Sequence, residues 1–223
     1  MPKIDNWVAS TPTGRCIVIG AGSLAIMVAD AIVTAGRCAF ADIAMVDDDP
    51  QSHDKVRHGI RVLGEINLVM PLAGESSVET GVVIAIARNT AREAVAARLP
   101  GDLPWMTVVH AGATVSPLAV LGEGTIVLSG CAIDPECTIG RHVLVNKLCS
   151  LGHNCVLEDF VQLAPSVSSG GIHARGSFTG MGANVLPGVR IGIGAIVGAG
   201  AMVRQNVPDG ALAMGVPATI RWA

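Results

Sequence analysis

The chain contains no tyrosine and few other aromatic residues, with three Phe and three Trp among 223 residues. Half of the residues are nonetheless apolar, so a core has to be built mainly from Val, Ile, Leu and Ala. Only 15% of the residues are charged, and the net charge of −3 lacks the basic surplus that would neutralise phosphates. The composition therefore argues against nucleic acid and against an anionic membrane surface as partners.

Long uncharged apolar segments are also missing. Glycine or polar residues interrupt every stretch long enough to span a membrane, so we expect no transmembrane helix. The first residues include an acid and no apolar region before the polar stretch at 10–15, so we expect no signal peptide. The six cysteines show neither the close pairing of a zinc site nor the setting of a disulfide framework. These features predict a cytoplasmic chain without a metal site.

The sequence does contain a repeat of six residues. Aliphatic side chains recur at this spacing from residue 109 to 163 and again from 185 to 203. Such a period fits neither a helix nor a flat sheet, but it is the signature of a parallel β-helix, whose turns stack on their neighbours. A second set, four places after the first, is small or β-branched and includes Cys131, Cys137, Cys149 and Cys155. Both sets should point inward, which makes these cysteines core residues.

The region before residue 105 has a different pattern. Short apolar strands alternate with helices, and this predicts a small parallel sheet of Rossmann type with ligands at the carboxyl ends of its strands. The strands are expected at 16–19, 43–46 and 81–87, and the helices at 24–35 and 92–99.

Three segments follow from these patterns: an N-terminal tail (1–15), a Rossmann-like domain (16–104) and a β-helix domain (105–223). The join at 100–104 is short and contains no flexible linker. We therefore expect the sheet domain to sit rigidly on one end of the coil.

A glycine-rich turn follows the first strand. Gly20 and Gly22 precede the helix and Asp47 follows the second strand, which satisfies a loose dinucleotide fingerprint. The domain is too short for the half that holds a nicotinamide, which disfavours NAD. The same turn could hold another nucleotide or a nucleotide sugar through backbone N–H groups and a carboxylate. A purely structural tight turn is the alternative.

With these features in place, the chain resembles the PglD/NeuD-like family of sugar acetyltransferases. The resemblance implies an α/β Rossmann-like domain that binds a nucleotide sugar, followed by an all-β left-handed parallel β-helix of hexapeptide repeats. It also implies an acyltransferase that uses acetyl-CoA and forms a homotrimer, with acetyl-CoA wedged between neighbouring coils. In order and spacing it rests on IGAG at 19–22, VDD at 46–48, RNTAR at 88–92, the segment 146–155, LPG at 186–188 and GVPA at 215–218.

The resemblance implies that His153 is the general base, and the repeat places this residue at an outward corner. The family often has a carboxylate at the next position, whereas this chain has Asn154. An amide can orient the imidazole but cannot stabilise its cation with a full charge. We therefore expect either a weaker base or a carboxylate from elsewhere, with Glu158 or Asp159 as candidates. Gln162 stands where the family can have a second histidine and could donate a hydrogen bond to the thioester oxygen.

Further residues are implied as acetyl-CoA contacts. Met181 and Ala199 correspond to positions that line the acetyl-CoA channel. The sixfold repeat is interrupted at 164–171, where Gly170 and Gly171 could bring a backbone N–H to the oxyanion that forms during attack. An insertion at a corner without this role is the alternative.

The implied sugar site departs from the family in part. Ser23-Leu24 replaces the common Gly-His, so the imidazole expected to contact the sugar is missing, and Ala87 replaces a glycine. The implied substrate contacts are Gly22, Ser23, Leu24, Asp47, Asp48 and Ala87.

The implied function is N-acetylation of a nucleotide-linked amino sugar in bacterial glycan biosynthesis. Transfer is expected to be direct, because the inward Cys149 and Cys155 are poorly placed as nucleophiles. An O-acetyltransferase acting on a hydroxyl of a sugar or sialic acid stays open. So does a non-catalytic nucleotide-sugar-binding protein with a decayed site, which Leu24, Asn154 and Gln162 would support.

Overall fold

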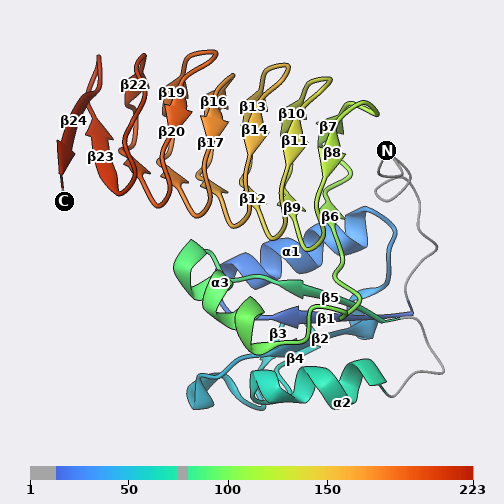
Figure 1. Ribbon diagram of the computed structural model, residues 1–223. Coiled ribbons are helices and arrows are strands. Elements are labelled where there is room, and N and C mark those ends of the chain that lie inside the picture. Colours follow the sequence, from blue (N-terminus) through green and yellow to red (C-terminus); the bar gives the residue numbers. More distant parts are fainter. Residues whose placement is uncertain (1–13, 75–79, 223) are drawn as a thin grey trace.

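The structure is a computed structural model that describes residues 14–74 and 80–222. The expected tail at 1–15 lies almost entirely outside the described residues, as does the segment on which the signal-peptide expectation rests. Figure 1 shows two units, a small α/β domain and a row of stacked strands that runs along one side of it. This division matches the change of pattern in the sequence.

The α/β domain has a parallel three-stranded sheet of order β2-β1-β5. Its strands are almost completely buried, which explains why they are continuous apolar runs without alternation. Helix α1 covers one face of the sheet, and α2 and α3 cover the other. The predicted elements are confirmed with small shifts in their ends: β1 (Arg15–Ile19), α1 (Ser23–Thr34), β2 (Ile43–Val46), β5 (Thr80–Ile84) and α3 (Asn89–Arg98).

The chain between α1 and β5 contains, besides β2, short elements that the sequence did not predict. Elements of two to six residues are too short to have a periodic signal. None of the helices within the described residues is long and apolar enough to cross a membrane. The added elements are the 3-10 helices at Phe40–Asp42, Pro50–Ser52 and Ile66–Leu68, the hairpin of β3 (Val56–Arg57) and β4 (Ile60–Arg61), and α2 (Val69–Gly74).

The C-terminal unit is a parallel β-solenoid with a triangular cross-section, as the repeat predicts. Its strands form three sheets, which we call faces I, II and III in the order in which the chain visits them. Face I contains β6 (Val108–Val109), β9 (Ile126–Val127), β12 (Leu144–Val145), β15 (Gln162–Leu163), β18 (Phe178–Thr179), β21 (Ile196–Val197) and the closing hairpin of β23 (Ala211–Met214) and β24 (Thr219–Trp222). Face II contains β7 (Thr114–Val115), β10 (Ala132–Ile133), β13 (Ser150–Leu151), β16 (Ser168–Ser169), β19 (Asn184–Val185) and β22 (Met202–Val203). Face III contains β8 (Val120–Leu121), β11 (Thr138–Ile139), β14 (Val156–Leu157), β17 (Ile172–His173) and β20 (Arg190–Ile191).

Both predicted inward positions of the repeat form the solenoid core. They are buried from residue 127 to 167 and are half-buried only in the first turn, which has no neighbour before it. The four cysteines expected in the core are at most 2% exposed. Nearly every corner turns through a residue with positive φ at its third place, such as Gly124 at 69° and Asn154 at 60°. This conformation favours glycine because it has no Cβ.

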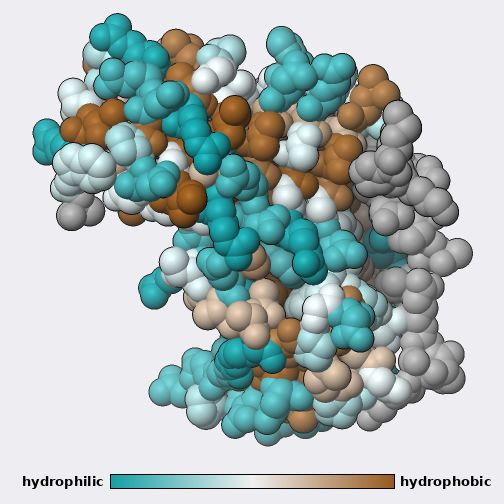
Figure 2. All heavy atoms as spheres, in the orientation of Figure 1, coloured by the Kyte–Doolittle hydropathy of each residue, from teal (hydrophilic) through white to brown (hydrophobic). Residues whose placement is uncertain are grey.

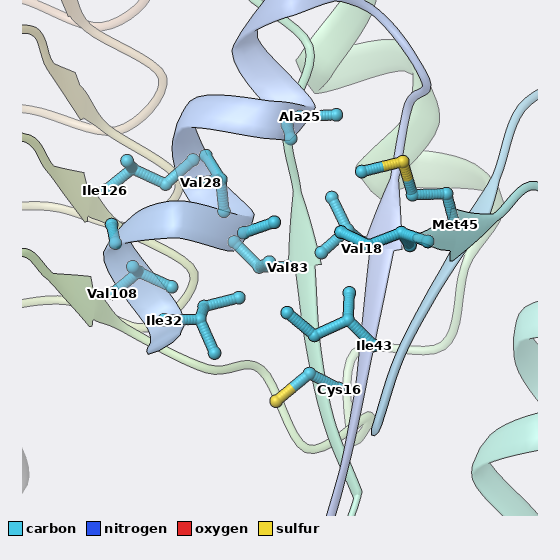
Figure 3. Close-up of a cluster of buried hydrophobic side chains, with 14 of the residues drawn as sticks. Cys16, Val18, Ala25, Val28, Ile32, Ile43, Met45, Val83, Val108 and Ile126 are labelled. Carbon is cyan, nitrogen blue, oxygen red and sulfur yellow. The ribbon is translucent and has the colours of Figure 1, made fainter. Parts of the chain in front are cut away.

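The α/β domain packs on the side of the first turns, not on the end of the coil, so that expectation was wrong. In Figure 3, Val28 and Ile32 of α1 lie toward Val108 and Ile126 on face I. Leu144, one turn further along the same face, belongs to the same buried cluster. These outward positions are apolar because α1 removes them from water.

Candidate active site

His153 lies in the corner between β13 of face II and β14 of face III. Its side chain is exposed, as the repeat predicts. The ring Nδ1 is 2.9 Å from Oδ1 of Asn154, and Nδ2 of Asn154 donates to Oε2 of Glu136 over 2.8 Å. The three side chains therefore form a chain of hydrogen bonds along the surface of the solenoid. Such an arrangement orients an imidazole while leaving its other nitrogen, Nε2, available to accept a proton.

The candidate carboxylates Glu158 and Asp159 do not serve His153, and that expectation was wrong. Both lie in the next corner, between faces III and I. Oε2 of Glu158 accepts from the backbone N–H of Arg175 (2.9 Å), and Oδ1 of Asp159 accepts from that of Arg141 (2.7 Å). These carboxylates tie adjacent turns together. Sequence reasoning missed Glu136, although it precedes Asn154 by 18 residues, one full turn of a regular six-residue repeat.

The interruption of the repeat is a shortened corner, so the alternative of an insertion is wrong. Only Gly170 and Gly171 separate β16 from β17, whereas four residues form each corner before it. Gly170 N–H donates to Val185 O (3.2 Å) and Gly171 N–H to Ser169 Oγ (3.1 Å). Neither N–H is free for an oxyanion. A Cβ at 171 would lie 2.5 Å from Val189 O, so close packing explains the glycine.

A buried polar cluster lies beside this corner, inside the solenoid. His173 is fully buried, with Nε2 2.8 Å from Ser169 Oγ and Nδ1 3.2 Å from Thr179 Oγ1. Burial lowers the pKa of His173 to about 4. The ring is therefore neutral at physiological pH, and its position away from solvent excludes it as the acid–base group.

The implied acetyl-CoA contacts lie elsewhere on the prism. Gln162 points outward from β15 on face I and is half-buried. Met181 and Ala199 are exposed at successive corners between faces I and II. His153 lies at the corner between faces II and III. One chain alone therefore does not bring these residues together with His153.

The implied sugar site lies at the carboxyl ends of the sheet strands. Gly22 caps α1, and Ser23 and Leu24 begin the helix. Asp47 is already bound to this turn, because its Oδ2 accepts from Ala21 N–H over 2.7 Å. The Asp47 carboxylate therefore stabilises the turn, and it also lies at the edge of the turn.

Asp48 and Ala87 differ in what they offer to a ligand. Asp48 pairs with Arg98 over 2.6 Å and accepts from Ile66 N–H, and the Arg98 guanidinium holds its pKa below the usual range. Ala87 is exposed after β5, and its carbonyl accepts from Arg92 over 2.8 Å. Its backbone position is therefore fixed.

Arg92 joins the two units, a role that sequence reasoning did not assign. Its side chain is 1% exposed and donates to the carbonyls of Ile86 and Ala87 in the α/β domain. It also donates to the carbonyls of His142 and Phe160 in the solenoid, over 2.7 and 3.0 Å. Burial lowers its pKa to about 10, which leaves it charged at neutral pH. The strand end beside the implied sugar site is therefore held rigidly against the solenoid.

The cysteines do not provide a nucleophile at this site. Cys149 and Cys155 are at most 1% exposed. Burial raises the pKa of the Cys155 thiol to about 12, and a hydrogen bond to Cys131 with burial raises that of Cys149. Their thiolates are therefore scarce and inaccessible, in agreement with direct transfer. Among the described residues, no three His, Cys, Asp or Glu side chains converge as a metal site would need.

Comparison with known proteins identifies the family. A family profile described as the PglD N-terminal domain matches residues 15–99. A structure of PerB from Caulobacter crescentus, in complex with CoA and GDP-perosamine, is 33% identical over 96% of this chain and 100% of its own, with a TM-score of 0.82. The chain belongs to the PglD-like family of sugar acetyltransferases. Its solenoid agrees with the left-handed β-helix expected of that family.

Two other solved structures are similar over nearly the whole chain. A variant of perosamine N-acetyltransferase from Caulobacter crescentus, with one histidine replaced by asparagine and with CoA and GDP-perosamine bound, is 32% identical (TM-score 0.84) and covers 96% of this chain and 100% of its own. The acetyltransferase domain of PglB from Neisseria gonorrhoeae, in complex with acetyl coenzyme A, is 28% identical (TM-score 0.81) and covers 93% and 98%. No curated protein sequence matches the chain.

Proposed function

We propose that the chain transfers the acetyl group of acetyl-CoA to the amino group of a nucleotide-linked amino sugar, with His153 as general base. The observation that carries the proposal is the exposed His153 ring with Nδ1 committed to Asn154. Nε2 is then the ring nitrogen left to accept a proton. The relatives that bind CoA and GDP-perosamine support the substrate class.

The reaction proceeds in one displacement at the thioester carbonyl. The amine nitrogen attacks the carbonyl carbon, a C–N bond forms, and the proton of the amine passes to Nε2 of His153. The C–S bond then breaks and coenzyme A leaves as the thiolate. Met181, Ala199, Gly170 and Gly171 are proposed as contacts of acetyl-CoA, the glycines through close approach of their backbone. Gln162 is proposed as a hydrogen-bond donor to the thioester oxygen.

The nucleotide sugar is proposed to bind at the turn before α1. Backbone N–H groups at a helix N-terminus favour phosphate oxygens. Asp47 holds this turn through Ala21, and Asp48 and Ala87 flank it at the ends of the neighbouring strands. Gly22 leaves open space, because a Cβ there would meet nothing within 4 Å.

We propose a homotrimer, because the two halves of the site lie on opposite sides of one chain. The α/β domain covers face I, whereas His153 lies at the corner between the other two faces. A nucleotide sugar held by one chain therefore needs the His153 of another. Figure 2 shows apolar residues gathered over the solenoid, and Leu118, Leu148 and Met181 are each more than half exposed. Such a surface favours association. We propose a cytoplasmic location, which the cysteine usage supports.

The direct test is release of thiol from acetyl-CoA by the purified chain. The acceptors are GDP-, UDP- and dTDP-linked amino sugars, with the corresponding hydroxyl sugars as matched compounds. Turnover of an amino sugar supports the proposal. Turnover confined to the hydroxyl sugars would indicate an O-acetyltransferase, and nucleotide-sugar binding without thiol release would indicate a binding protein.

A site shared between chains can be tested by complementation. His153→Gln removes the base, and Gly22→Glu places a negative side chain where phosphate is proposed to bind. Each homo-oligomer should be inactive. Mixing the two by co-expression should restore about a quarter of the parent activity, because that share of interfaces pairs an intact base with an intact turn under random assembly. No recovery in mixed oligomers would contradict the shared site.

A further inference from the structure

A carboxylate stands one turn before the proposed base and reaches it through an amide. Glu136 is 2.8 Å from Nδ2 of Asn154, whose Oδ1 is 2.9 Å from Nδ1 of His153. We propose that Glu136 is a positioning residue that fixes the tautomer of His153 by holding the amide of Asn154 in one orientation. The inference deepens the proposed function and rests on it for the role of His153.

The donor and acceptor chemistry of the three groups allows one arrangement. An ionised carboxylate only accepts hydrogen bonds, so the NH₂ of Asn154 has to face Glu136. The carbonyl of the amide then faces His153, and a carbonyl also only accepts. Nδ1 must therefore carry the proton, which leaves the lone pair of a neutral imidazole on Nε2. This is the tautomer that a base acting at Nε2 requires.

The amide alone would not select this tautomer. Without a carboxylate behind it, Asn154 can turn its NH₂ toward Nδ1 and donate to a lone pair there. The ring proton would then lie on Nε2, and the outward nitrogen could not accept a proton from the amine. The acceptor-only character of Glu136 removes this second arrangement.

The charged groups around His153 make Glu136 the effective carboxylate. The preceding corner contributes Asp134 and Glu136, while the following corner consists of Gly170 and Gly171 and contributes no charge. Of the two acids, Glu136 is the one that bonds to Asn154. Its charge also stabilises the imidazolium formed when Nε2 takes a proton, although through an intervening amide and so less than in direct contact.

The backbone conformation places Glu136 and Asn154 at equivalent positions of adjacent turns. Glu136 and Asn154 have φ of 64° and 60°, and Gly188 takes the same place in a later corner of this edge with φ of 77°. Glycine adopts this region without strain, whereas residues with a Cβ do not. Because Glu136 and Asn154 take the same corner place in adjacent turns, the backbone sets their side chains next to each other, where they form the 2.8 Å hydrogen bond.

The kinetic test is a cycle of two substitutions, Glu136→Gln and Asn154→Asp. The amide introduced by Glu136→Gln has both donor and acceptor atoms, so it no longer fixes the amide of Asn154. We expect kcat to fall about tenfold while the KM for acetyl-CoA stays unchanged. In the Asn154→Asp protein a carboxylate contacts His153 directly. There Glu136→Gln should be neutral or raise kcat, because it removes a facing negative charge. An equal loss in both backgrounds would show a merely structural role and overturn the proposal.

The spectroscopic test needs no substrate. Imidazole ¹⁵N shifts of the histidine-labelled protein, with His153→Gln to assign the signal, report which ring nitrogen carries the proton. The parent protein should show the proton of neutral His153 on Nδ1, and Glu136→Gln should give a mixture. Glu136→Gly should also give a mixture while relieving backbone strain, which separates the tautomer from stability. If the parent protein carries the proton of neutral His153 on Nε2, or if both variants keep the tautomer ratio of the parent, the proposed role of Glu136 is wrong. If the parent protein transfers no acetyl group, the proposed function is wrong. The ¹⁵N measurement still shows whether Glu136 fixes the tautomer of His153.

Discussion

The middle and the C-terminal turns of the solenoid place different residue types at the same corner position. Between residues 136 and 166 the left-handed place at each corner is taken by a residue with a side chain: Glu136, His142, Leu148, Asn154, Phe160 and Ser166. From 176 onward the left-handed place is glycine, at 176, 182, 188, 194, 200 and 210. The backbone is similar in both regions, since φ lies between 50° and 80° throughout. The two regions therefore differ in the side chain at this position and not in the backbone conformation.

Four of these side chains in the middle turns have described contacts, those of Glu136, His142, Asn154 and Phe160. His142 packs between Trp105 and Phe160, with ring centroids 4.7 and 5.3 Å away, and so helps to join the two units. Asn154 and Glu136 orient the proposed base. A side chain in left-handed backbone costs about 1 kcal/mol relative to glycine. At four of these corners the side chain contributes to a site or an interface, whereas Leu148 is exposed and Ser166 makes its described contact through its backbone.

The largest expected effect comes from removing the side chain that the middle turns present. His153→Gln should lower kcat/KM by roughly 100- to 10,000-fold, the usual range for losing a general base. Gln205 is exposed in a later, shorter corner of the same edge, between Val203 of β22 and Val207, which pairs with Ile191 of β20. Gln205→Ala is therefore the matched control and should leave activity within twofold. Comparable losses in both variants would mean that this edge matters as a surface and not through His153.

A second prediction separates two kinds of glycine in one C-terminal corner. A Cβ at Gly192 would lie against the backbone nitrogen of Asp209 and 2.6 Å from the carbonyl carbon of Pro208. Gly194 has φ of 61° and open space around it. Gly192→Ala should therefore cost about 3 kcal/mol through overpacking, and Gly194→Ala about 1 kcal/mol through strain alone. Urea unfolding measures both, and equal costs would contradict the distinction.

The third prediction concerns the junction between the two regions, where His173 is buried. Its folded pKa of about 4 lies below the ordinary value of 6.5. The unfolded chain therefore binds the proton first as pH falls, and stability is lost below about pH 6.5 until the folded ring titrates. Between pH 7.5 and 5 the loss should be about 2 kcal/mol from this residue.

Urea unfolding at the two pH values, with the parent and His173→Gln, measures this contribution. The variant should be less stable at pH 7.5, because Ser169 and Thr179 lose their partner, but its stability should fall less with acid. An identical pH dependence in the two proteins would exclude His173 as a source of acid sensitivity.

The sequence predicted the structure correctly where the repeat can be packed in only one way. A period of six with two apolar places per repeat can be buried only inside a prism, so the core cysteines and the outward position of His153 follow from the pattern. Contacts between turns were missed because they depend on the length of a turn. Glu136 and Asn154 are 18 residues apart, a spacing that marks neighbours only once three strands are known to form each turn.

The docking of the α/β domain could also have been predicted from residues one turn apart. Val108, Ile126 and Leu144 follow one another on face I at successive turns and point outward, where a free solenoid would be polar. The alternative of an insertion at 170–171 was wrong because the pattern shows an interruption but not whether residues are gained or lost. A corner that is two residues shorter and a corner that is a few residues longer both interrupt the six-residue spacing.

The smallest expected effect comes from placing a C-terminal type of corner in the middle turns. Ser166 has φ of 63°, is exposed, and makes its described contact through the backbone, from its N–H to Lys147 O. Ser166→Gly should relieve the strain but add freedom to the unfolded chain, for a net gain of about 0.5 kcal/mol. Ser168, on the extended strand β16, provides the control, since the same substitution there only adds freedom and should destabilise by a similar amount. Urea midpoints that move in the same direction for both serines would mean that left-handed strain is not what distinguishes the two regions.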